Sequence, residues 1–495
     1  MNLAENLDRT ARARGRSLAV ALGDEAISFG EVEHWSRRVA GFLAGRGVRS
    51  GDRVGLMLPD VLEFAALYYG ILRLGAVVVP MSPLLTERGV RHRLQDSGAR
   101  TLLAGSSCRK AVEPGARLLG VAVWLLDPGG LPDLVGDAPS LDPVEPMDAD
   151  DTAVIAYTAG TTARPRGAEL THGNLLRNCE VVVNDLVQLT SEDVVFGGLP
   201  LCHAFGQTAG LNAAVRAGAC LVLLARFDAE AALETLHDRG VTVMQGGPMT
   251  YDAILRHPRH ADYDLSRLRV CVSGGAAMAV EVLLAFEDTF HCRILEGYGL
   301  VEAPVASFNR MDRRRVGSIG LPVNGVELRV ADDAGDDVED GEPGEIVVRG
   351  HHVMKGYWGR PEETAAAIVD GWLRTGDAGI RDEDGFFYVV GRTKELIVRG
   401  GLKVFPREVE EVLREHEAVL EAAVIGVPHP SLGEEVQAVV TLRPGAMATS
   451  GELRDFVKGR VADHKYPREI DIVEEMPHSS TGKIRNRAIR LETRT

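Results

Sequence analysis

The sequence has no long hydrophobic run that could cross a membrane. Its most apolar window, Val61–Pro80, is interrupted by Glu63 and Arg73, which makes a membrane span untenable. The N-terminal stretch MNLAENLDRTARARG lacks the apolar core of a signal peptide. We therefore expect a cytoplasmic protein with no membrane span.

Cysteine is scarce and positive charge is in deficit. The six cysteines form neither a CxxC pair nor a ladder with histidine, so we expect reduced thiols and no zinc site. Lys and Arg number 55 against 71 Asp and Glu, a formal net charge of −16. This balance argues against nucleic-acid binding and against docking on anionic membranes. A polyanionic ligand would need a local basic patch.

At 495 residues, the chain is too long for one hydrophobic core, so we expect two or more domains. Strand-like runs alternate with helical patterns up to about residue 300, which favours an α/β architecture. Short alternating runs over 317–350 indicate antiparallel β structure, and a small α+β unit follows Gly391. We found no internal repeat.

Several individual elements can be predicted. Ser28 and Glu31 form a capping box for a helix that ends near Gly47. The segment Leu103–Asp150 is rich in Gly, Pro and Asp, and we expect a loosely packed connection there. Buried strands are expected at Val54–Leu58, Ala76–Val79, Ala153–Ala156, Val194–Leu199, Val241–Gln245 and Val270–Ser273, and in the C-terminal part near Ala422–Val427 and Val436–Leu442, with helices from Pro406 and Glu452.

The most informative segment is YTAGTTARPRG, at Tyr157–Gly167. The predicted buried strand Ala153–Ala156 is followed by a loop of glycines and threonines, and an amphipathic helix is then predicted to begin at His172, after Thr171. Such a loop forms a nest of backbone N–H groups that suits phosphate oxygens. The lysine and hydroxyl order of a P-loop is absent, so this is not a Walker-type site. A solvent turn rich in small residues is the alternative for this loop alone.

Five further motifs follow it along the chain: LPLCHAFG at Leu199–Gly206, EGYGLVE at Glu296–Glu302, GWLRTGD at Gly371–Asp377, GRTKELIVRGGLKVFPREVE at Gly391–Glu410, and STGKIR at Ser480–Arg485. With the first loop, these motifs resemble in order those of the adenylate-forming superfamily, in its acyl-CoA ligase branch. The resemblance covers essentially the whole chain. It implies a large N-terminal α/β domain at 1–391 and a small, mobile α+β domain at 392–495.

The resemblance also implies how the N-terminal motifs act. Glu302 would hold Mg²⁺, Tyr298 would stack on adenine, and His203 would border the acyl pocket. A packed core histidine is the alternative for His203. The loop would bind phosphate through Thr158, Thr161, Thr162 and Arg166.

In the C-terminal motifs, Asp377 would accept hydrogen bonds from the ribose hydroxyls, with Arg392 nearby. Lys394 would be the hinge between the domains, and Lys483 the catalytic lysine that bridges the carboxylate and the α-phosphate. Gly400 and Gly401 would line the tunnel for the pantetheine arm of CoA. The alternative for Asp377 is an acidic residue in a turn, and for Gly400 and Gly401 it is a plain β-turn. For Arg392, Lys394 and Lys483 the alternative is a solvated side chain at the surface.

Four positions depart from the family pattern. Ala159 stands in place of a serine, Ala163 of a glycine, Arg166 of a lysine and Val301 of a threonine. All four handle ATP phosphates in the family. Losing two hydrogen bonds to charged oxygens would cost about 1.5–3 kcal/mol each. We therefore expect ATP-dependent adenylation to be weakened or lost.

The expected function is acyl-CoA ligation through an acyl-adenylate, with thioester formation retained. The cofactors would be CoA and the AMP moiety, with ATP and Mg²⁺ added if adenylation is retained. A separate enzyme could then supply the acyl-adenylate. The alternatives are a fully competent ATP-dependent synthetase and a non-catalytic acyl- or nucleotide-binding protein on this fold. The identity of the carboxylic acid is not readable from the sequence.

Overall fold

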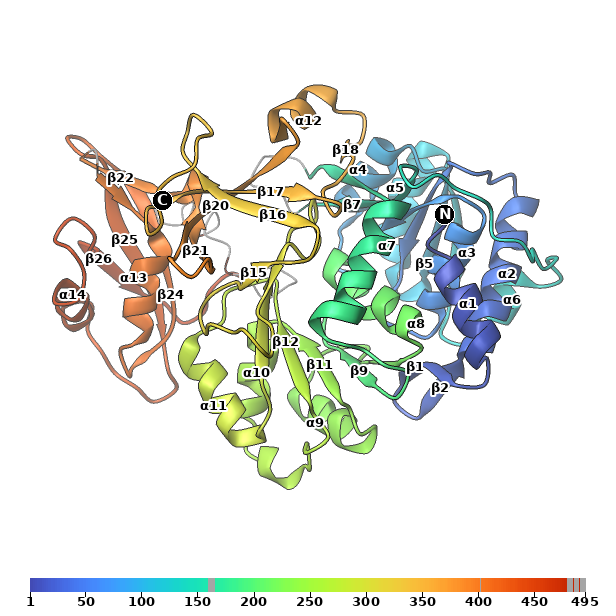
Figure 1. The fold of residues 1–495 in the computed structure, drawn as a ribbon, viewed down its shortest axis with the longest axis horizontal. Helices are drawn as coiled ribbons and strands as arrows, with labels where there is room; N and C mark the ends of the chain where they lie inside the picture. Colours follow the sequence, from blue (N-terminus) through green and yellow to red (C-terminus); the bar gives the residue numbers. More distant parts are fainter. Residues whose placement is uncertain (159–164, 401, 479–483, 485–488, 490–495) are drawn as a thin grey trace. The chain divides into compact units, whose positions relative to one another are not determined.

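The computed structural model describes residues 1–158, 165–400, 402–478, 484 and 489 (Figure 1). The chain forms two compact units. The larger unit comprises Met1–Val316, Gly320–Leu328 and Val348–Leu373, and the smaller unit comprises Gly317–Ile319, Arg329–Val347 and Arg374–Thr495. The expected domain boundary between residues 391 and 392 stays a prediction.

The larger unit contains two sheets with mainly parallel cores. The first is parallel from β1 to β13, with antiparallel strands at both edges. Its order is β15 (Leu321–Pro322), β14 (Ser307–Phe308), β13 (Ile294–Tyr298), β12 (Val270–Ser273), β11 (Val243–Gly246), β9 (Val194–Gly197), β10 (Cys220–Leu223), β1 (Leu18–Leu22) and β2 (Glu25–Ser28).

The second sheet is parallel from β7 to β6, and β8 and β18 extend it in antiparallel pairing. Its order is β18 (Gly356–Tyr357), β8 (Gly167–Thr171), β7 (Thr152–Tyr157), β4 (Val77–Pro80), β3 (Arg53–Met57), β5 (Thr101–Gly105) and β6 (Ala122–Leu126). The strands expected near Val54, Ala76, Ala153, Val194, Val241 and Val270 are confirmed, with ends shifted by a few residues.

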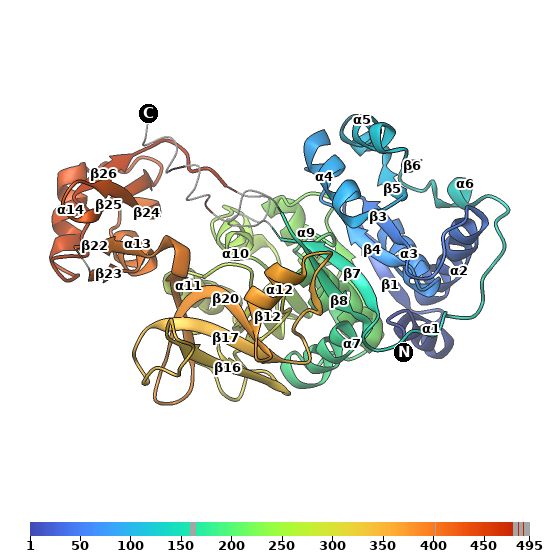
Figure 2. The same ribbon diagram turned by 90° about the horizontal axis from the view of Figure 1, so that it is seen from above.

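Helices pack between and around these sheets (Figure 2). Helix α7 (His172–Val181) contacts β8 of the second sheet, α8 (Ala213–Ala217) contacts β10 of the first, and the two helices contact each other. This layering is the predicted α/β architecture. The other helices of this unit are α1 (Glu5–Arg14), α2 (Phe29–Gly45), α3 (Glu63–Arg73), α4 (Glu87–Ser97), α5 (Arg109–Leu119), α6 (Leu131–Val135), α9 (Ala229–Asp238), α10 (Pro248–Leu255), α11 (Val280–Phe290) and α12 (Pro361–Ala367).

Local capping starts two of these helices where the sequence predicted. Ser28 and Glu31 form a capping box at α2, and Thr171 and Asn174 form one at α7. Each box satisfies backbone N–H groups that the first helical turn leaves unpaired. The predicted helix starts at residues 29 and 172 are confirmed.

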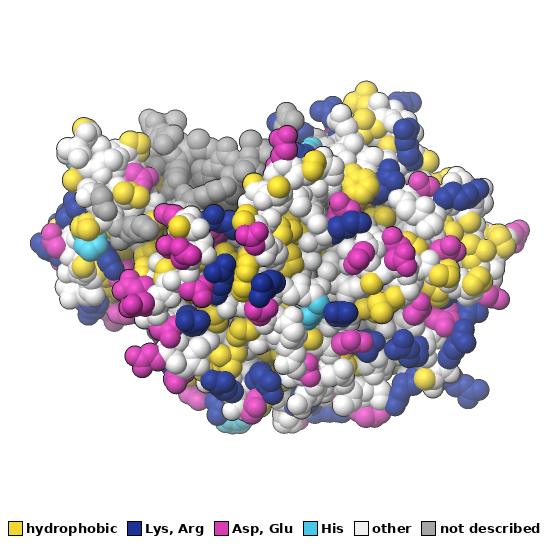
Figure 3. Space-filling view, turned by 45° about the horizontal axis from the view of Figure 1, so that its top comes forward, with side chains coloured by type: hydrophobic (Ala, Val, Ile, Leu, Met, Phe, Trp, Pro, Cys, Tyr) yellow, Lys and Arg dark blue, Asp and Glu magenta, His cyan; other side chains and the backbone are white. Residues whose placement is uncertain are grey.

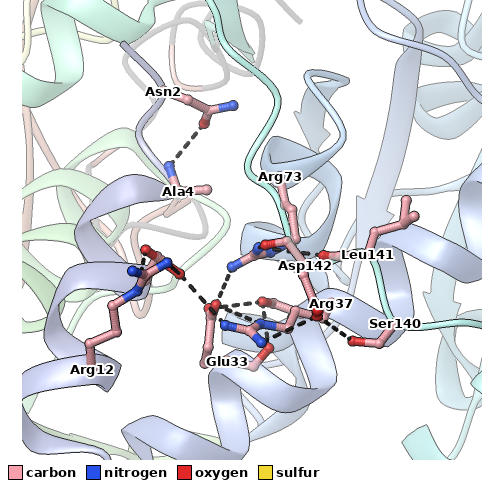
Figure 4. A network of polar contacts seen from close by, with 11 residues as sticks. Asn2, Ala4, Arg12, Glu33, Arg37, Arg73, Ser140, Leu141 and Asp142 are labelled. Atoms are coloured by element: carbon pink, nitrogen blue, oxygen red, sulfur yellow. Dashed lines mark hydrogen bonds and ion pairs between the residues drawn. The ribbon is translucent and has the colours of Figure 1, made fainter.

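The prediction of a loose connection over Leu103–Asp150 is wrong for its first part. Residues 101–135 form β5, α5, β6 and α6. The remaining stretch, after residue 135, is held by a polar network around Arg73, whose side chain is buried with 1% of the residue exposed (Figure 4). The Arg73 guanidinium pairs with Glu33 and donates to the Asp142 carbonyl at 2.6 Å. Sequence reasoning missed this network because its members are far apart in the chain.

A further sheet has the order β16 (Val326–Ala331), β17 (Gly344–Gly350), β20 (Trp372–Arg381) and β19 (Ile368–Val369), with β21 (Phe387–Arg392) paired to β20. The smaller unit contains a sheet of order β23 (Leu402–Val404), β22 (Ile397–Arg399), β25 (Gly433–Leu442) and β24 (Val419–His429), with β26 (Glu469–Ile472) parallel to β25. Helices α13 (Pro406–Arg414) and α14 (Ser450–Lys458) pack on it around an apolar core. This is the predicted α+β pattern.

Within the described residues, no helix is both long and apolar enough to span a bilayer. All six cysteines are free thiols. On the face shown in Figure 3, acidic and basic side chains are interspersed over the surface.

Candidate active site

The first motif lies at the turn of the β7–β8 hairpin. Tyr157 pairs with Gly167, and the Thr158 N–H donates to the Arg166 carbonyl at 2.9 Å. The sequence indicated no strand between the loop and the helix at His172, and the structure places β8 there. The short run Ala168–Leu170 gave too little periodicity to indicate a strand.

The hydroxyl of Thr158 is a candidate contact for an anionic ligand. The residue is 7% exposed, and in the described part of the chain its Oγ1 is buried without a hydrogen-bond partner. A buried hydroxyl without a partner is costly, so this atom fits a phosphate oxygen. The other predicted loop positions, Ala159, Thr161, Thr162 and Ala163, lie outside the described residues.

Arg166 contacts protein groups at the far end of the loop. Its Nη1 lies 3.3 Å from Glu363 Oε2, and its guanidinium carbon lies 4.0 Å from the centre of the Tyr357 ring. A planar guanidinium can stack on a ring and form an ion pair at the same time. Arg166 therefore contacts two other side chains, the ring of Tyr357 and the carboxylate of Glu363.

Arg360 links the two ends of this loop. Its Nη1 lies 3.0 Å from Glu363, the partner of Arg166. Its Nη2 lies 2.7 Å from Asp96 Oδ1, and Asp96 Oδ2 accepts from the Tyr157 hydroxyl at 2.8 Å. Sequence reasoning missed Asp96, Arg360 and Glu363 because none of them belongs to a motif and tertiary folding brings them together.

Glu302, the predicted Mg²⁺ ligand, interacts with the same tyrosine. The Tyr357 hydroxyl donates to Glu302 Oε1 at 2.9 Å. Burial and the Glu302 charge raise the pKa of Tyr357 well above its usual value, so the phenol remains a donor at neutral pH. A half-buried carboxylate supplies the hard oxygen that Mg²⁺ prefers, so the residues present fit this ion.

The turn that follows Glu302 is held from α7. Asn178, which is fully buried, donates from Nδ2 to the Pro304 carbonyl at 2.7 Å and to the Val305 carbonyl at 3.3 Å. Val305 has φ = 42°, a strained value for a β-branched residue. Sequence reasoning missed Asn178, which has no motif around it. Tyr298, the predicted adenine contact, is the half-buried last residue of β13.

His203 lies in the segment between β9 and a π-helix at Gly206–Asn212. Burial lowers its pKa, and the Arg93 charge lowers it further, so the ring is neutral at pH 7. Its Nε2 is buried, with no hydrogen-bond partner in the described chain. This environment suits either a packed histidine or the wall of an acyl pocket, and both interpretations stay open.

Arg93 on α4 was not predicted. Its guanidinium lies 5.3 Å from the centre of the Tyr157 ring, and Nη1 donates to the Gly89 carbonyl at 3.1 Å. Burial lowers its pKa, an unusual environment for arginine. Arg93 therefore joins Arg166 and Arg360 as a cation beside the described ends of the loop.

In the smaller unit, Asp377 and Arg392 form the predicted pair. They are direct partners on the antiparallel strands β20 and β21, and Arg392 Nε lies 2.8 Å from Asp377 Oδ1. Asp377 is 5% exposed. Its N–H donates to Thr375 Oγ1 at 3.0 Å, and that hydroxyl donates to the Ile346 carbonyl at 2.6 Å. The carboxylate is thus fixed by its fold.

Of the four other predicted residues of this unit, the structure describes the backbone of two, Lys394 and Gly400. Lys394 lies in a 3₁₀ turn at Thr393–Glu395, two residues after Arg392. Gly400 lies in the turn between β22 and β23 with φ = 57°, which favours glycine, and its N–H donates to the Leu432 carbonyl at 2.8 Å. Gly401 and Lys483 lie outside the described residues. The roles of all four residues stay predictions.

Comparison with known families gives two matches. Residues 7–358 match the model of the family described as "AMP-binding enzyme", and residues 408–483 match "AMP-binding enzyme C-terminal domain". The first match alone covers more than half of the chain.

Individual relatives are similar over nearly their whole length. A long-chain-fatty-acid–CoA ligase of Bacillus subtilis is 35% identical, over 96% of this chain and 92% of its own. The crystal structure of ATP-bound MatB from Rhodopseudomonas palustris has a TM-score of 0.94 at 31% identity and covers 99% of both chains. The anthranilate CoA ligase AuaEII in complex with anthranoyl-AMP has a TM-score of 0.94 at 30% identity, over 99% of this chain and 97% of its own. The predicted adenylate-forming fold is confirmed.

Proposed function

The chain belongs to the AMP-binding enzyme family, and from this premise we propose that it is an acyl-CoA ligase that works through an acyl-adenylate. A carboxylate attacks the α-phosphate of ATP, which releases pyrophosphate, and the thiol of CoA then displaces AMP. The observation that carries the proposal is the buried Asp377 carboxylate held by Arg392, in the motif for which the resemblance implies ribose binding. The similarity to CoA ligases over the whole chain supports it.

The proposed roles follow the motifs. Asp377 accepts hydrogen bonds from the two ribose hydroxyls, Tyr298 stacks on adenine, and Glu302 holds Mg²⁺. Mg²⁺ would neutralise phosphate charge as the carboxylate approaches. Lys483 bridges the carboxylate and the α-phosphate from a loop that arrives and leaves with its domain. The remaining assignments are the acyl pocket (His203), the phosphate loop (Thr158, Thr161, Thr162, Arg166), the pantetheine tunnel (Gly400, Gly401), the hinge (Lys394), and domains at 1–391 and 392–495.

A narrower hypothesis is that adenylation is weakened while thioester formation is retained. It rests on Ala159, Ala163, Arg166 and Val301, which alter the groups that handle phosphate. The pairing of Arg166 with Glu363 supports it, because this cation is already neutralised within the fold. The relatives favour the alternative, a fully competent synthetase, because they are named as CoA ligases and one of them is an ATP complex. A separate enzyme that supplies acyl-adenylate is needed only under the narrower hypothesis.

One experiment tests both the proposed acyl-CoA ligase activity and the narrower hypothesis of weakened adenylation. The purified protein is given CoA with a panel of fatty and cyclic acids plus ATP, and separately CoA with the matching synthetic acyl-adenylates. Thioester from both substrates at similar rates indicates the competent ligase. Thioester from the adenylate alone, with background exchange of pyrophosphate into ATP, indicates the weakened form. Thioester from neither substrate contradicts the proposed function and favours a binding protein.

The variant Ala159→Ser/Ala163→Gly/Val301→Thr restores three family residues together. Under the weakened-adenylation hypothesis, pyrophosphate exchange should rise above that of the native protein. Arg166 is left unchanged in this variant because its side chain contacts Tyr357 and Glu363.

A further inference from the structure

Tyr357 lies between two residues of the candidate site. Its ring is covered by the Arg166 guanidinium at 4.0 Å, and its hydroxyl donates to Glu302 Oε1 at 2.9 Å. The residue is only 5% exposed. No motif identified in the sequence contains it. It therefore connects the end of the phosphate loop to the predicted metal ligand.

We propose that Tyr357 is a positioning residue that orients the Glu302 carboxylate for Mg²⁺, and that Arg166 braces Tyr357 instead of neutralising phosphate charge. This inference rests on the proposed function, in which Glu302 binds the metal. It assigns a role to Tyr357 and gives a different role to Arg166 from the one the resemblance implies.

The backbone fixes Tyr357 before its side chain makes these contacts. Tyr357 pairs with Ala168 where β18 joins β8, and its N–H donates to Thr364 Oγ1 at 2.9 Å. Nearby, the Met354 N–H donates to the Glu302 carbonyl at 2.8 Å. The tyrosine and the glutamate are thus tied together by backbone as well as by side chain. A hydrogen bond to one carboxylate oxygen then limits rotation of the carboxylate and sets the direction of the other oxygen.

The geometry around Arg166 requires an arginine. Its flat face lies over the Tyr357 ring while Nη1 reaches Glu363, and Arg360 holds Glu363 from the other side at 3.0 Å. The ammonium group of a lysine is a point charge and cannot reproduce a stacked, laterally paired guanidinium. This gives a structural reason for arginine at a position where the family has lysine.

The test measures ATP binding by isothermal titration calorimetry, in excess Mg²⁺ and in EDTA. The difference between the two affinities is the contribution of the metal. The variants are Tyr357→Phe, which removes only the hydroxyl, and Arg166→Met and Arg166→Lys, which remove the stacked guanidinium. Tyr388→Phe is the matched control, because the Tyr388 hydroxyl also donates to a carboxylate, Asp382 Oδ2 at 3.1 Å. A thermal melt of each variant monitors folding.

For Tyr357→Phe we expect unchanged affinity in EDTA and a loss of about tenfold in the affinity gained from Mg²⁺, as is common when the partner of a metal ligand is removed. Arg166→Met should give the same pattern, and Arg166→Lys should lie between it and the native protein. Tyr388→Phe should behave as the native protein. These binding measurements are independent of thioester formation, so a failure of the proposed reaction is seen separately.

Three results would overturn the inference. One is a native-like Mg²⁺ dependence in Tyr357→Phe. Another is an equal loss of affinity in EDTA and in Mg²⁺ for the Arg166 variants, which would mean that Arg166 contacts phosphate directly. The third is native protein whose ATP affinity does not respond to Mg²⁺, since Glu302 would then hold no metal.

Discussion

Asp377 and Arg392 face each other across β20 and β21 with 2.8 Å between Oδ1 and Nε. The arginine is one-third exposed while the carboxylate is 7% exposed. The pair therefore holds a carboxylate acceptor in the middle of β20, opposite the last residue of β21, and it supports the prediction that Asp377 binds ribose.

Asp377→Ala should weaken the use of acyl-adenylate and CoA by about 10- to 100-fold for each ribose hydrogen bond lost, because a charged hydrogen bond is worth about 1.5–3 kcal/mol. The measurement is kcat/KM for thioester formation from synthetic acyl-adenylate. Asp340→Ala is the control, because Asp340 pairs with Arg381 at the surface of the same unit. A 2′,3′-dideoxy acyl-adenylate should be a poor substrate for the native protein. A native rate for Asp377→Ala would show that the ribose assignment is wrong.

Lys483→Ala should separate the two half-reactions. The ammonium group is needed where two anions meet during adenylation, so pyrophosphate exchange should fall to background. Thioester formation from supplied acyl-adenylate should continue. The test compares both assays on one protein preparation, with Lys458→Ala, on helix α14, as the control. Equal loss in both assays would contradict a role confined to adenylation.

His172 should make the protein sensitive to acid. Its Nδ1 accepts from the Leu3 N–H at 3.0 Å, and burial lowers its pKa to about 4 from the usual 6.5. Between about pH 4 and pH 6.5, His172 is therefore protonated in the unfolded chain and neutral in the folded chain. Stability should be undiminished above pH 6.5 and fall as the pH decreases toward 4, by on the order of 3 kcal/mol from this group.

The measurement is urea unfolding of native protein and of His172→Asn at pH 7 and pH 5. The asparagine does not titrate, so the variant should lose less stability between the two pH values. His352, whose pKa burial lowers to about 3, contributes in the same direction in both proteins. An equal pH dependence in the two proteins would exclude His172 as a source.

Arg73→Met should destabilise the larger unit by about 1.5–3 kcal/mol, because the buried Glu33 carboxylate loses one charged hydrogen bond and keeps only Arg37, at 3.0 Å, as a cationic partner (Figure 4). Adding Glu33→Leu should recover much of this loss, since an apolar pair avoids the desolvation cost of two charges. Urea unfolding measures both effects. Arg109→Met, which breaks an exposed pair with Glu113, is the control and should change stability by less than about 1 kcal/mol. Additive effects of the two buried substitutions would contradict the pairing.

Much of the fold could be predicted from local signals. The capping boxes at Ser28 and Thr171 fix helix starts through neighbouring residues, and apolar runs such as Val270–Ser273 are long enough to indicate buried strands. Strand β8 and the elements of 101–135 were missed, because short strands and short helices depend on partners that the local sequence does not contain. The antiparallel strands β20 and β21 around Asp377 and Arg392 lie beyond the stretch 317–350 for which the sequence predicted antiparallel β structure.

The sequence by itself determined the family and the order of the motifs, because each motif is a run of contiguous residues. Only the tertiary structure decided what Arg166 contacts. Its partners Tyr357 and Glu363 lie nearly two hundred residues away, and Asn178 of α7 donates to the Pro304 carbonyl in the turn after Glu302. Ion pairs, ring stacking and buried hydrogen bonds between distant segments depend on how sheets and helices pack, and no local pattern in the chain encodes them.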